Sequence, residues 1–242
     1  MRSIAFAALL ALAGAPALAQ TAGEGAQSPR AVIELFTSQG CSSCPPADKR
    51  LSEMAGDPDL VALTLPVDYW DYLGWKDTLA RPAFSNRQRA YAKLRGDRAV
   101  YTPQMVVNGE FACIGSDATA VAQSMRQATQ EDARLPVALA TKREGTRLTV
   151  EIGEGAEGAG ELWLLTIEPR VSVSIDRGEN RGRVAHYANV VRDIAPIGAW
   201  RGGPARFAIE RAGLSDAYVV LLQRRHDGRP GRILGAAKGP AL

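Results

Sequence analysis

Two cysteines separated by two serines are the residues of this chain best suited to chemistry. Cys41-Ser42-Ser43-Cys44 follows an apolar run over residues 31–37 and precedes a stretch of helical composition. A CxxC pair at a strand-to-helix junction is typical of redox-active dithiols, in which a thiolate is the nucleophile. The same pair in a loop between hairpins would indicate half of a zinc site. We predict Cys41 as the nucleophile and Cys44 as the resolving thiol, with a structural disulfide as the alternative.

The first nineteen residues have the pattern of an export signal. Arg2 supplies a charged start, residues 4–13 are apolar, and Ala17-Leu18-Ala19 is a small-x-small cleavage site. We predict a signal peptide over residues 1–19, a flexible tail over 20–30, and a periplasmic or secreted protein; a buried N-terminal helix is the alternative. An oxidising compartment permits both a Cys41–Cys44 disulfide and thiol exchange.

Composition argues against several other functions. The net charge is only +3 and no basic helix occurs, so nothing favours nucleic-acid binding. Three cysteines are too few for a disulfide framework, so a hydrophobic core must hold the chain. His186 and His226, the two histidines, lie far in sequence from the CxxC pair. We therefore expect no metal and no organic cofactor.

The order of elements changes near residue 135. Before it, apolar runs of strand length (32–36, 60–67, 104–107, 111–114) alternate with helical stretches (46–54, 75–94, 118–130) in the order found in thioredoxin. After it, short apolar runs alternate with turn residues, as in a β-sandwich. We predict an α/β thioredoxin-like domain over residues 31–134, followed by an all-β sandwich domain over 135–242.

Thr102-Pro103 precedes the strand that opens the predicted terminal hairpin. Its place relative to the CxxC pair and to the Asn108-Gly109 turn predicts a cis peptide bond, although trans is the commoner isomer. In this position, we expect Pro103 to keep metal ions away from the dithiol. The Thr102 backbone would remain free to pair with an extended substrate beside Cys41.

These motifs together resemble a known family. The segments that carry the resemblance are ELFTSQGCSSCPPAD at 34–48, VDYWD at 67–71, Thr102-Pro103, VNG at 107–109 and RGEN at 177–180. They are similar to the exported bacterial family catalogued as domain of unknown function 1223, which is assigned to the thioredoxin-like superfamily. The resemblance implies a fold and a compartment. It implies no activity, because the family has no established one.

The sequence departs from thioredoxin on both sides of the cysteines. Gly40 precedes Cys41 where thioredoxin has a tryptophan, and Pro45-Pro46 follow Cys44. A proline pushes the residue before it away from helical dihedral angles. We therefore expect a helix that begins at Pro45, with Cys44 outside it and Cys41 less influenced by the helix field.

Four further features of the sequence each have two possible interpretations. Glu34 is a candidate proton shuttle, or a strand-end acid that faces solvent. Asp68, Tyr69 and Trp70 follow a strand, where they could bind a peptide or sugar or pack on the next helix. Cys113 is expected to be a buried, inert thiol rather than a regulatory one. Residues 177–183 form a charged loop that either is solvated or binds an anionic partner.

The function predicted from these residues is an exported thiol–disulfide oxidoreductase. Its partners would be exported protein thiols or disulfides, or a redox partner protein. The alternative is a binding or scaffold module whose Cys41–Cys44 bridge is structural. A third possibility is an enzyme of different chemistry that uses Asp68 and Asp71. The sequence specifies neither the direction of electron flow nor the oligomeric state.

Overall fold

The computed structural model describes residues 28–155, 158–226 and 228–242. The predicted signal peptide, residues 1–19, and most of the predicted tail lie outside these residues. In chain order the first half contains β1 (Ala31–Thr37), α1 (Pro45–Met54), β2 (Leu60–Pro66), the 3-10 turn η1 (Asp71–Leu73), α2 (Pro82–Arg95), β3 (Gln104–Val107), β4 (Phe111–Ile114) and α3 (Ala118–Ala128). The second half contains β5 (Leu139–Glu144), β6 (Arg147–Ile152), β7 (Gly160–Ser174), β8 (Val184–Trp200), β9 (Ala205–Glu210), β10 (Tyr218–His226) and β11 (Arg229–Lys238).

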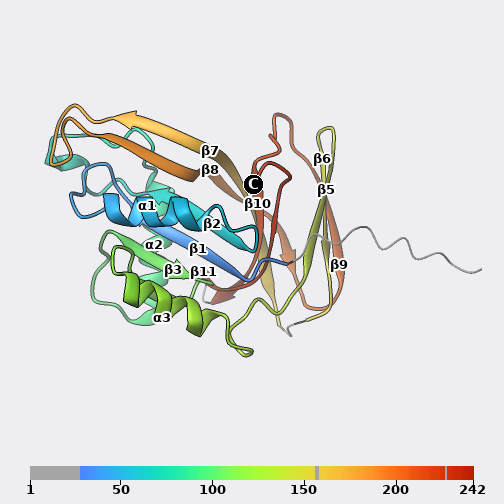
Figure 1. Cartoon of the computed structure of the whole chain (residues 1–242). Coiled ribbons are helices and arrows are strands. Elements are labelled where there is room, and N and C mark those ends of the chain that lie inside the picture. Colours follow the sequence, from blue (N-terminus) through green and yellow to red (C-terminus); the bar gives the residue numbers. More distant parts are fainter. Residues whose placement is uncertain (1–27, 156–157, 227) are drawn as a thin grey trace, which may run out of the picture.

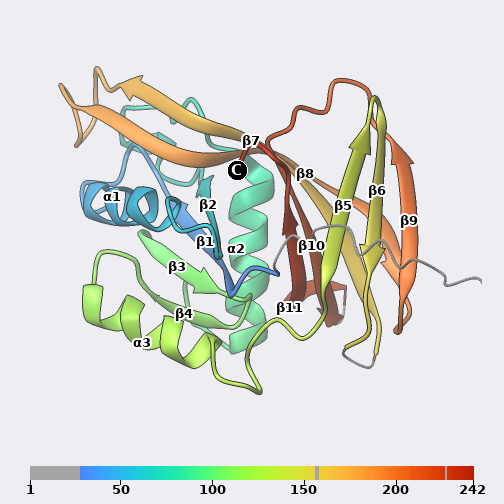
Figure 2. The same cartoon turned by 45° about the vertical axis from the view of Figure 1, so that its right-hand side comes forward.

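One continuous sheet runs through both halves of the chain (Figures 1 and 2). Within the described residues its eight strands follow the order β11-β10-β7-β8-β2-β1-β3-β4. At the junction, β2 and β8 are paired in parallel through Thr64 and Val190. Side chains reinforce this junction: Thr64 Oγ1 donates to the Ala188 carbonyl at 2.6 Å, and Asn189 Nδ2 donates to the Ala62 carbonyl at 3.0 Å.

The predicted fold class, a thioredoxin-like α/β domain followed by a separate β-sandwich, is wrong. Strands predominate over the three α-helices of the described residues, and strands of the second half extend the sheet of the first. Only β5, β6 and β9 form a second sheet there. Periodicity along the chain indicates which face of a strand is buried, but not which strand lies beside it.

The sheet separates the larger apolar clusters from one another. Ile33 and Leu35 of β1 face α1 and α3, whereas Val32 and Phe36 face the opposite side, which α2 covers (Figure 2). Strands of the second half contribute to the α2 side, through residues that include Leu165, Val191, Val219, Leu221 and Ile233. A further cluster lies between β7, β10, β11 and the three-stranded sheet. The core on the α2 side is therefore built jointly by both halves.

The β7–β8 hairpin is longer than the sequence predicts. Apolar runs on either side of Pro169 predict two strands, yet β7 continues from Gly160 to Ser174. β10 pairs with β7 only as far as Thr166. At Pro169, therefore, β7 is paired with β8 on one side and, among the described residues, has no strand on the other side. A proline without an N–H is tolerated at such an edge. The hairpin thereby extends beyond β10 and carries residues 175–183 to the loop between β1 and α1 (Figure 1).

Two turn and helix boundaries follow from local residues. The Asn108-Gly109 turn between β3 and β4 is present, with positive φ at both residues (50° and 75°), as a tight hairpin turn requires. Helix α2 begins at Pro82, where Arg81-Pro82 interrupts the stretch of helical composition at 75–94, and residues 75–81 are not part of it. Proline at the first helical position ends the preceding loop, because its fixed φ suits a helix start and its missing N–H is not needed there.

Candidate functional site

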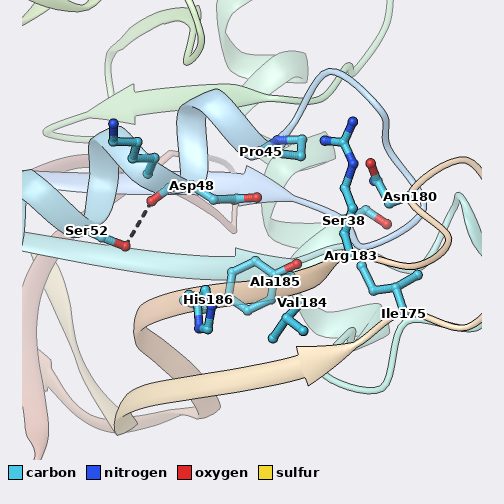
Figure 3. A pocket seen from close by; sticks show the side chains of 12 residues that line it. Ser38, Pro45, Asp48, Ser52, Ile175, Asn180, Arg183, Val184, Ala185 and His186 are labelled. Carbon is cyan, nitrogen blue, oxygen red and sulfur yellow. Dashed lines mark hydrogen bonds between the residues drawn. The ribbon is translucent and has the colours of Figure 1, made fainter.

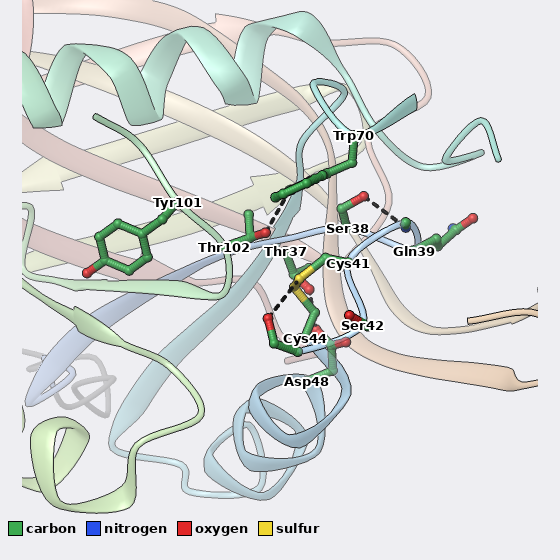
Figure 4. Close-up of a disulfide and its surroundings, with 12 residues drawn as sticks. Thr37, Ser38, Gln39, Cys41, Ser42, Cys44, Asp48, Trp70, Tyr101 and Thr102 are labelled. Carbon is green, nitrogen blue, oxygen red and sulfur yellow. Dashed lines mark hydrogen bonds between the residues drawn. A yellow bond between two sulfur atoms is a disulfide. The ribbon is translucent and has the colours of Figure 1, made fainter. Parts of the chain in front are cut away.

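Cys41 and Cys44 form a disulfide in the loop between β1 and α1, with their Cα atoms 5.4 Å apart (Figure 4). Two turns shape this loop: the Cys41 N–H donates to the Ser38 carbonyl at 3.1 Å, and the Cys44 N–H donates to the Cys41 carbonyl at 3.2 Å. Both cysteines are buried, with 4% of Cys41 and 0% of Cys44 exposed. The predicted pairing is confirmed, but Cys41 is less accessible than a surface nucleophile would be.

Helix α1 begins at Pro45, as predicted, whereas Cys44 already has helical dihedral angles (φ −78°, ψ −36°). The expectation that Pro45 would push Cys44 out of this region is wrong, because the disulfide and the bond to the Cys41 carbonyl hold Cys44 in place. Pro45 and Pro46 have no N–H, and the next two amides donate to the Cys44 carbonyl. The N-terminus of α1 therefore has few free backbone N–H groups that could donate a hydrogen bond to a cysteine thiolate.

Asp48 is a buried acid one helical turn beyond Cys44, and the two residues lie close together in Figure 4. Thr37 Oγ1 donates to Asp48 Oδ1 at 2.6 Å. Burial raises the pKa of Asp48 to about 7; the hydrogen bond from Thr37 opposes this shift and the charge of Asp77 adds to it. A carboxyl group with such a pKa can give or take a proton near neutral pH.

Glu34 does not occupy the position that a proton shuttle to Cys44 requires. It lies on the α2 side of β1, where it is fully buried and ion-paired with Arg87 at 2.6 Å (Nε to Oε1). The Tyr91 hydroxyl also donates to its carboxylate, at 2.6 Å. Neither predicted interpretation, shuttle or solvent-facing acid, describes this buried ion pair. The buried acid on the α1 side is Asp48, which the sequence analysis missed.

The Thr102–Pro103 peptide bond is cis, as predicted. Pro103 directly precedes β3, the neighbour of β1, and its carbonyl accepts a hydrogen bond from Gly115 at 2.9 Å. Trp70 Nε1 donates to Thr102 Oγ1 at 2.8 Å, and both side chains lie next to the disulfide (Figure 4). The fold thus brings three of the predicted site residues, Trp70, Thr102 and Pro103, to the cysteine loop.

Asp68 and Tyr69 instead contact α2. Asp68 accepts a hydrogen bond from the Ser85 hydroxyl, and the Tyr69 hydroxyl donates to Gln88 Oε1 at 3.1 Å. Burial raises the pKa of Tyr69 to about 12. These contacts agree with packing on the following helix. The neighbouring Tyr72 is 77% exposed and stacks on Trp70, with ring centroids 6.5 Å apart, so Trp70 and Tyr72 form an aromatic surface near the disulfide.

The loop between β1 and α1 is held by two distant segments. Asp77 accepts the Gln39 N–H at 2.8 Å, and burial raises the pKa of Asp77. Asn180, from the tip of the β7–β8 hairpin, donates through Nδ2 to the carbonyls of Gln39 and Cys41, both at 2.9 Å. Glu179 accepts the Ser42 N–H at 3.3 Å. The charged loop at 177–183 therefore contacts the cysteine loop, a role that no local pattern indicated.

The profile of a family described as "Protein of unknown function (DUF1223)" matches residues 32–223. The chain belongs to the DUF1223 family. The matched region includes both the cysteine loop and the hairpin tip that holds it.

Two solved structures are similar to this DUF1223 member. A crystal structure of a protein from Agrobacterium tumefaciens is 32% identical, with a TM-score of 0.80, over 88% of this chain and 95% of that chain. HBP35 of Porphyromonas gingivalis is 12% identical, with a TM-score of 0.56, over 88% of this chain and 76% of that chain. The second likeness shows a shared fold alone. No curated protein matches the sequence.

The third cysteine of this DUF1223 member, Cys113, lies on β4 opposite Met105. It is 7% exposed, and burial raises the pKa of its thiol. A buried thiol with a raised pKa contains little reactive thiolate at neutral pH. Its position agrees with the inert thiol expected from the sequence.

Neither a metal cluster nor a spanning helix was found in the part of the chain that the structure describes. There, no group of three or more His, Cys, Asp or Glu side chains could hold a metal ion. Among the same residues, no helix is long and apolar enough to cross a membrane.

Proposed function

We propose that this DUF1223 member is an exported thiol–disulfide oxidoreductase that acts through the Cys41–Cys44 pair. The observation that carries the proposal is Asp48, a buried acid with a pKa of about 7 beside Cys44. A disulfide that only braces a loop needs no proton donor, whereas thiol exchange needs one at the leaving sulfur.

In the reducing direction for this protein, a substrate thiolate attacks Cys41 Sγ and forms a mixed disulfide. The Cys41–Cys44 bond breaks, and the electron pair leaves on Cys44 as a thiolate. Protonated Asp48 donates its proton to that thiolate. In the second step another substrate thiolate attacks the substrate sulfur of the mixed disulfide, and the electron pair of the broken bond leaves on Cys41 as a thiolate. The substrate is released as a disulfide and both protein cysteines end reduced, a two-electron exchange. In the opposite direction reduced Cys41 attacks a substrate disulfide, and Asp48 takes the proton from Cys44 as Cys44 resolves the mixed disulfide.

The partner class we propose is an exported protein thiol or disulfide, or a redox partner protein. Trp70 and Tyr72 supply an aromatic surface beside the disulfide, and Thr102 supplies a polar group at its edge. Because Cys41 is only 4% exposed, a protein substrate reaches its sulfur after local movement of the covering loops. Asp68 and Tyr69 position the loop that carries Trp70 through their contacts with α2.

Export remains a proposal from the signal pattern at residues 1–19. Its test is expression of the full chain in a bacterial host, followed by cell fractionation and N-terminal sequencing. A mature chain that begins near Gln20 in the periplasmic or secreted fraction supports export. An intact Met1 in the cytoplasmic fraction contradicts it.

The reduction potential of the Cys41–Cys44 pair tests the redox role. Equilibration with glutathione buffers, followed by trapping of free thiols, should give a value between about −120 and −270 mV, the span of known exchange proteins. The Cys113→Ala variant is the matched control, because it removes the third thiol and should leave the potential unchanged. A potential below about −300 mV would indicate a structural bridge.

A structural bridge in a binding module is the second candidate, and one observation favours it. Asn180 and Asp77 hold the cysteine loop closed, and both cysteines are buried. Substrate trapping separates the two functions. In the Cys44→Ala variant, an exchange protein accumulates mixed disulfides through Cys41, whereas a scaffold forms none above the level of a Cys41→Ala, Cys44→Ala control.

A further inference from the structure

A cavity of about 330 Å³ lies between α1 and the outer half of the β7–β8 hairpin (Figure 3). Pro45, Asp48, Lys49 and Ser52 line it from the helix. The hairpin lines it with residues that include Ile175, Asn180, Arg183, Val184 and Tyr187. Its volume is within the range of small-molecule sites. The cavity arises only because the hairpin extends over α1.

The hairpin side of the cavity is largely apolar. Ile175, Val184, Ala185 and Tyr187 contribute side chains to it. Val184, the first residue of β8, is 53% exposed and presents an apolar side chain beside the cavity. Apolar walls with a few polar groups are the usual composition of sites for small organic molecules.

Two cationic side chains line the cavity, those of Lys49 and Arg183, and a second hollow continues past His186 to Arg170. Among the described residues, no acidic side chain forms an ion pair with Arg183, and Lys49 makes only a long, exposed contact of 3.9 Å with Glu53. Asp48 also lines the cavity, and burial raises its pKa to about 7, so near neutral pH it carries only part of a full negative charge.

Asn180, which lines the cavity, has an unsatisfied hydrogen-bond acceptor. Its Nδ2 donates to two backbone carbonyls, which fixes the orientation of the amide, and the residue is 2% exposed. Its Oδ1 is buried and has no hydrogen-bond partner. Buried polar atoms without partners are rare, and each points to a missing donor. An N–H or O–H on a molecule in the cavity could supply it.

We propose that this cavity binds a small organic anion with an apolar body and an N–H or O–H group. The apolar walls bury the body, Arg183 and Lys49 attract the anionic group, and Asn180 Oδ1 accepts the hydrogen bond. The cavity shares Asp48 and Asn180 with the surroundings of the disulfide, but its binding test uses the oxidised protein and involves no thiol exchange, so its failure leaves the proposed redox function untouched.

The probe is 8-anilinonaphthalene-1-sulfonate, which has an aromatic body, one N–H and one negative charge. Its fluorescence titration should saturate at one molecule per folded chain. N-phenyl-1-naphthylamine, the same scaffold without the sulfonate, should bind about tenfold more weakly, a difference of about 1.4 kcal/mol. Octanoate should displace the anionic probe at lower concentrations than octanol does. Equal affinities for the charged and neutral probes would overturn the proposal.

Variants locate the probe. Arg183→Gln and Lys49→Gln should each weaken binding of the sulfonate severalfold and leave binding of the neutral analogue unchanged. Val184→Asp, at an exposed position that tolerates substitution, should weaken binding of both the sulfonate and the neutral analogue. Arg206→Gln, which removes a positive charge from exposed β9, is the matched control and should change neither. An Arg183→Gln variant with the near-ultraviolet circular dichroism and sulfonate affinity of the parent would refute the assignment.

Discussion

Proton transfer at the disulfide depends, in our proposal, on the Asp48 carboxyl. Thr37 fixes one of its oxygens, and burial raises its pKa to about 7. Glu34 is buried as well, but Arg87 and Tyr91 already use its carboxylate. The two buried acids therefore have different roles, because Glu34 lies on the face of β1 that α2 covers, whereas Asp48 lies on α1, against the opposite face.

Replacement of Asp48 by asparagine should slow reduction of the disulfide by dithiothreitol about tenfold or more, because the leaving Cys44 thiolate loses its proton donor. The pH dependence should change too. After correction for the thiolate fraction of the reagent, the parent rate should fall as the pH rises through about 7, since Asp48 is then deprotonated. The Asp48→Asn rate should lack this step. Stopped-flow measurements across pH 5 to 9 check both expectations.

Glu53→Gln is the matched control for Asp48→Asn. It removes an acid from the same helix at an exposed position and should leave the reduction rate and its pH profile unchanged. An Asp48→Asn variant with the parent's profile would show that Asp48 does not take part in exchange.

At the scale of elements, the β7–β8 hairpin completes the cysteine loop. Asn180 bonds to the carbonyls on either side of Gly40, and Glu179 accepts the Ser42 N–H. A hairpin of ordinary length would end before it reached α1. The length of β7 and β8, which Pro169 does not interrupt, is therefore what brings the RGEN segment to the disulfide.

Asn180→Ala should release the cysteine loop and accelerate reduction of the disulfide. The two hydrogen bonds from Nδ2 contribute about 1 kcal/mol each, so the loss of both increases the population of the open loop roughly thirtyfold. Reduction kinetics with dithiothreitol measure the effect. Arg181→Ala, an exposed neighbour in the same loop, is the control. An unchanged rate for Asn180→Ala would mean that the hairpin tip does not restrict access to Cys41.

At the scale of the whole molecule, the two halves share one sheet and one core. β8 lies beside β2, and Leu165, Val219 and Ile233 of the second half pack in the cluster of Val32 and Phe36. Gln223 of β10 also donates to the Tyr91 hydroxyl at 2.7 Å, which links the second half to the buried Glu34 ion pair. Neither half retains these contacts without the other.

A fragment of residues 28–134 should therefore fail to fold by itself. Without the second half, apolar residues on the α2 side of the sheet would be exposed to water, at a cost of about 25 cal/mol per Å². Far-ultraviolet circular dichroism and limited proteolysis should show an unfolded, rapidly cleaved fragment. The chain of residues 28–242 is the control. A cooperative thermal transition in the fragment would contradict this expectation and support two independent domains.

The sequence by itself determined the local features of this protein: the CxxC pair between a strand and a helix, the helix start at Pro45, the cis Thr102–Pro103 bond and the Asn108-Gly109 turn. Each of these depends on the chemistry of a few adjacent residues. Tertiary structure alone decided that β8 pairs with β2, that Glu34 is an ion-pair partner, and that Asn180 contacts the cysteine loop. Those outcomes depend on contacts between residues up to 141 positions apart, as for Asn180 and Gln39. Hydrophobic periodicity is a local pattern, so it does not indicate which distant residues will be in contact.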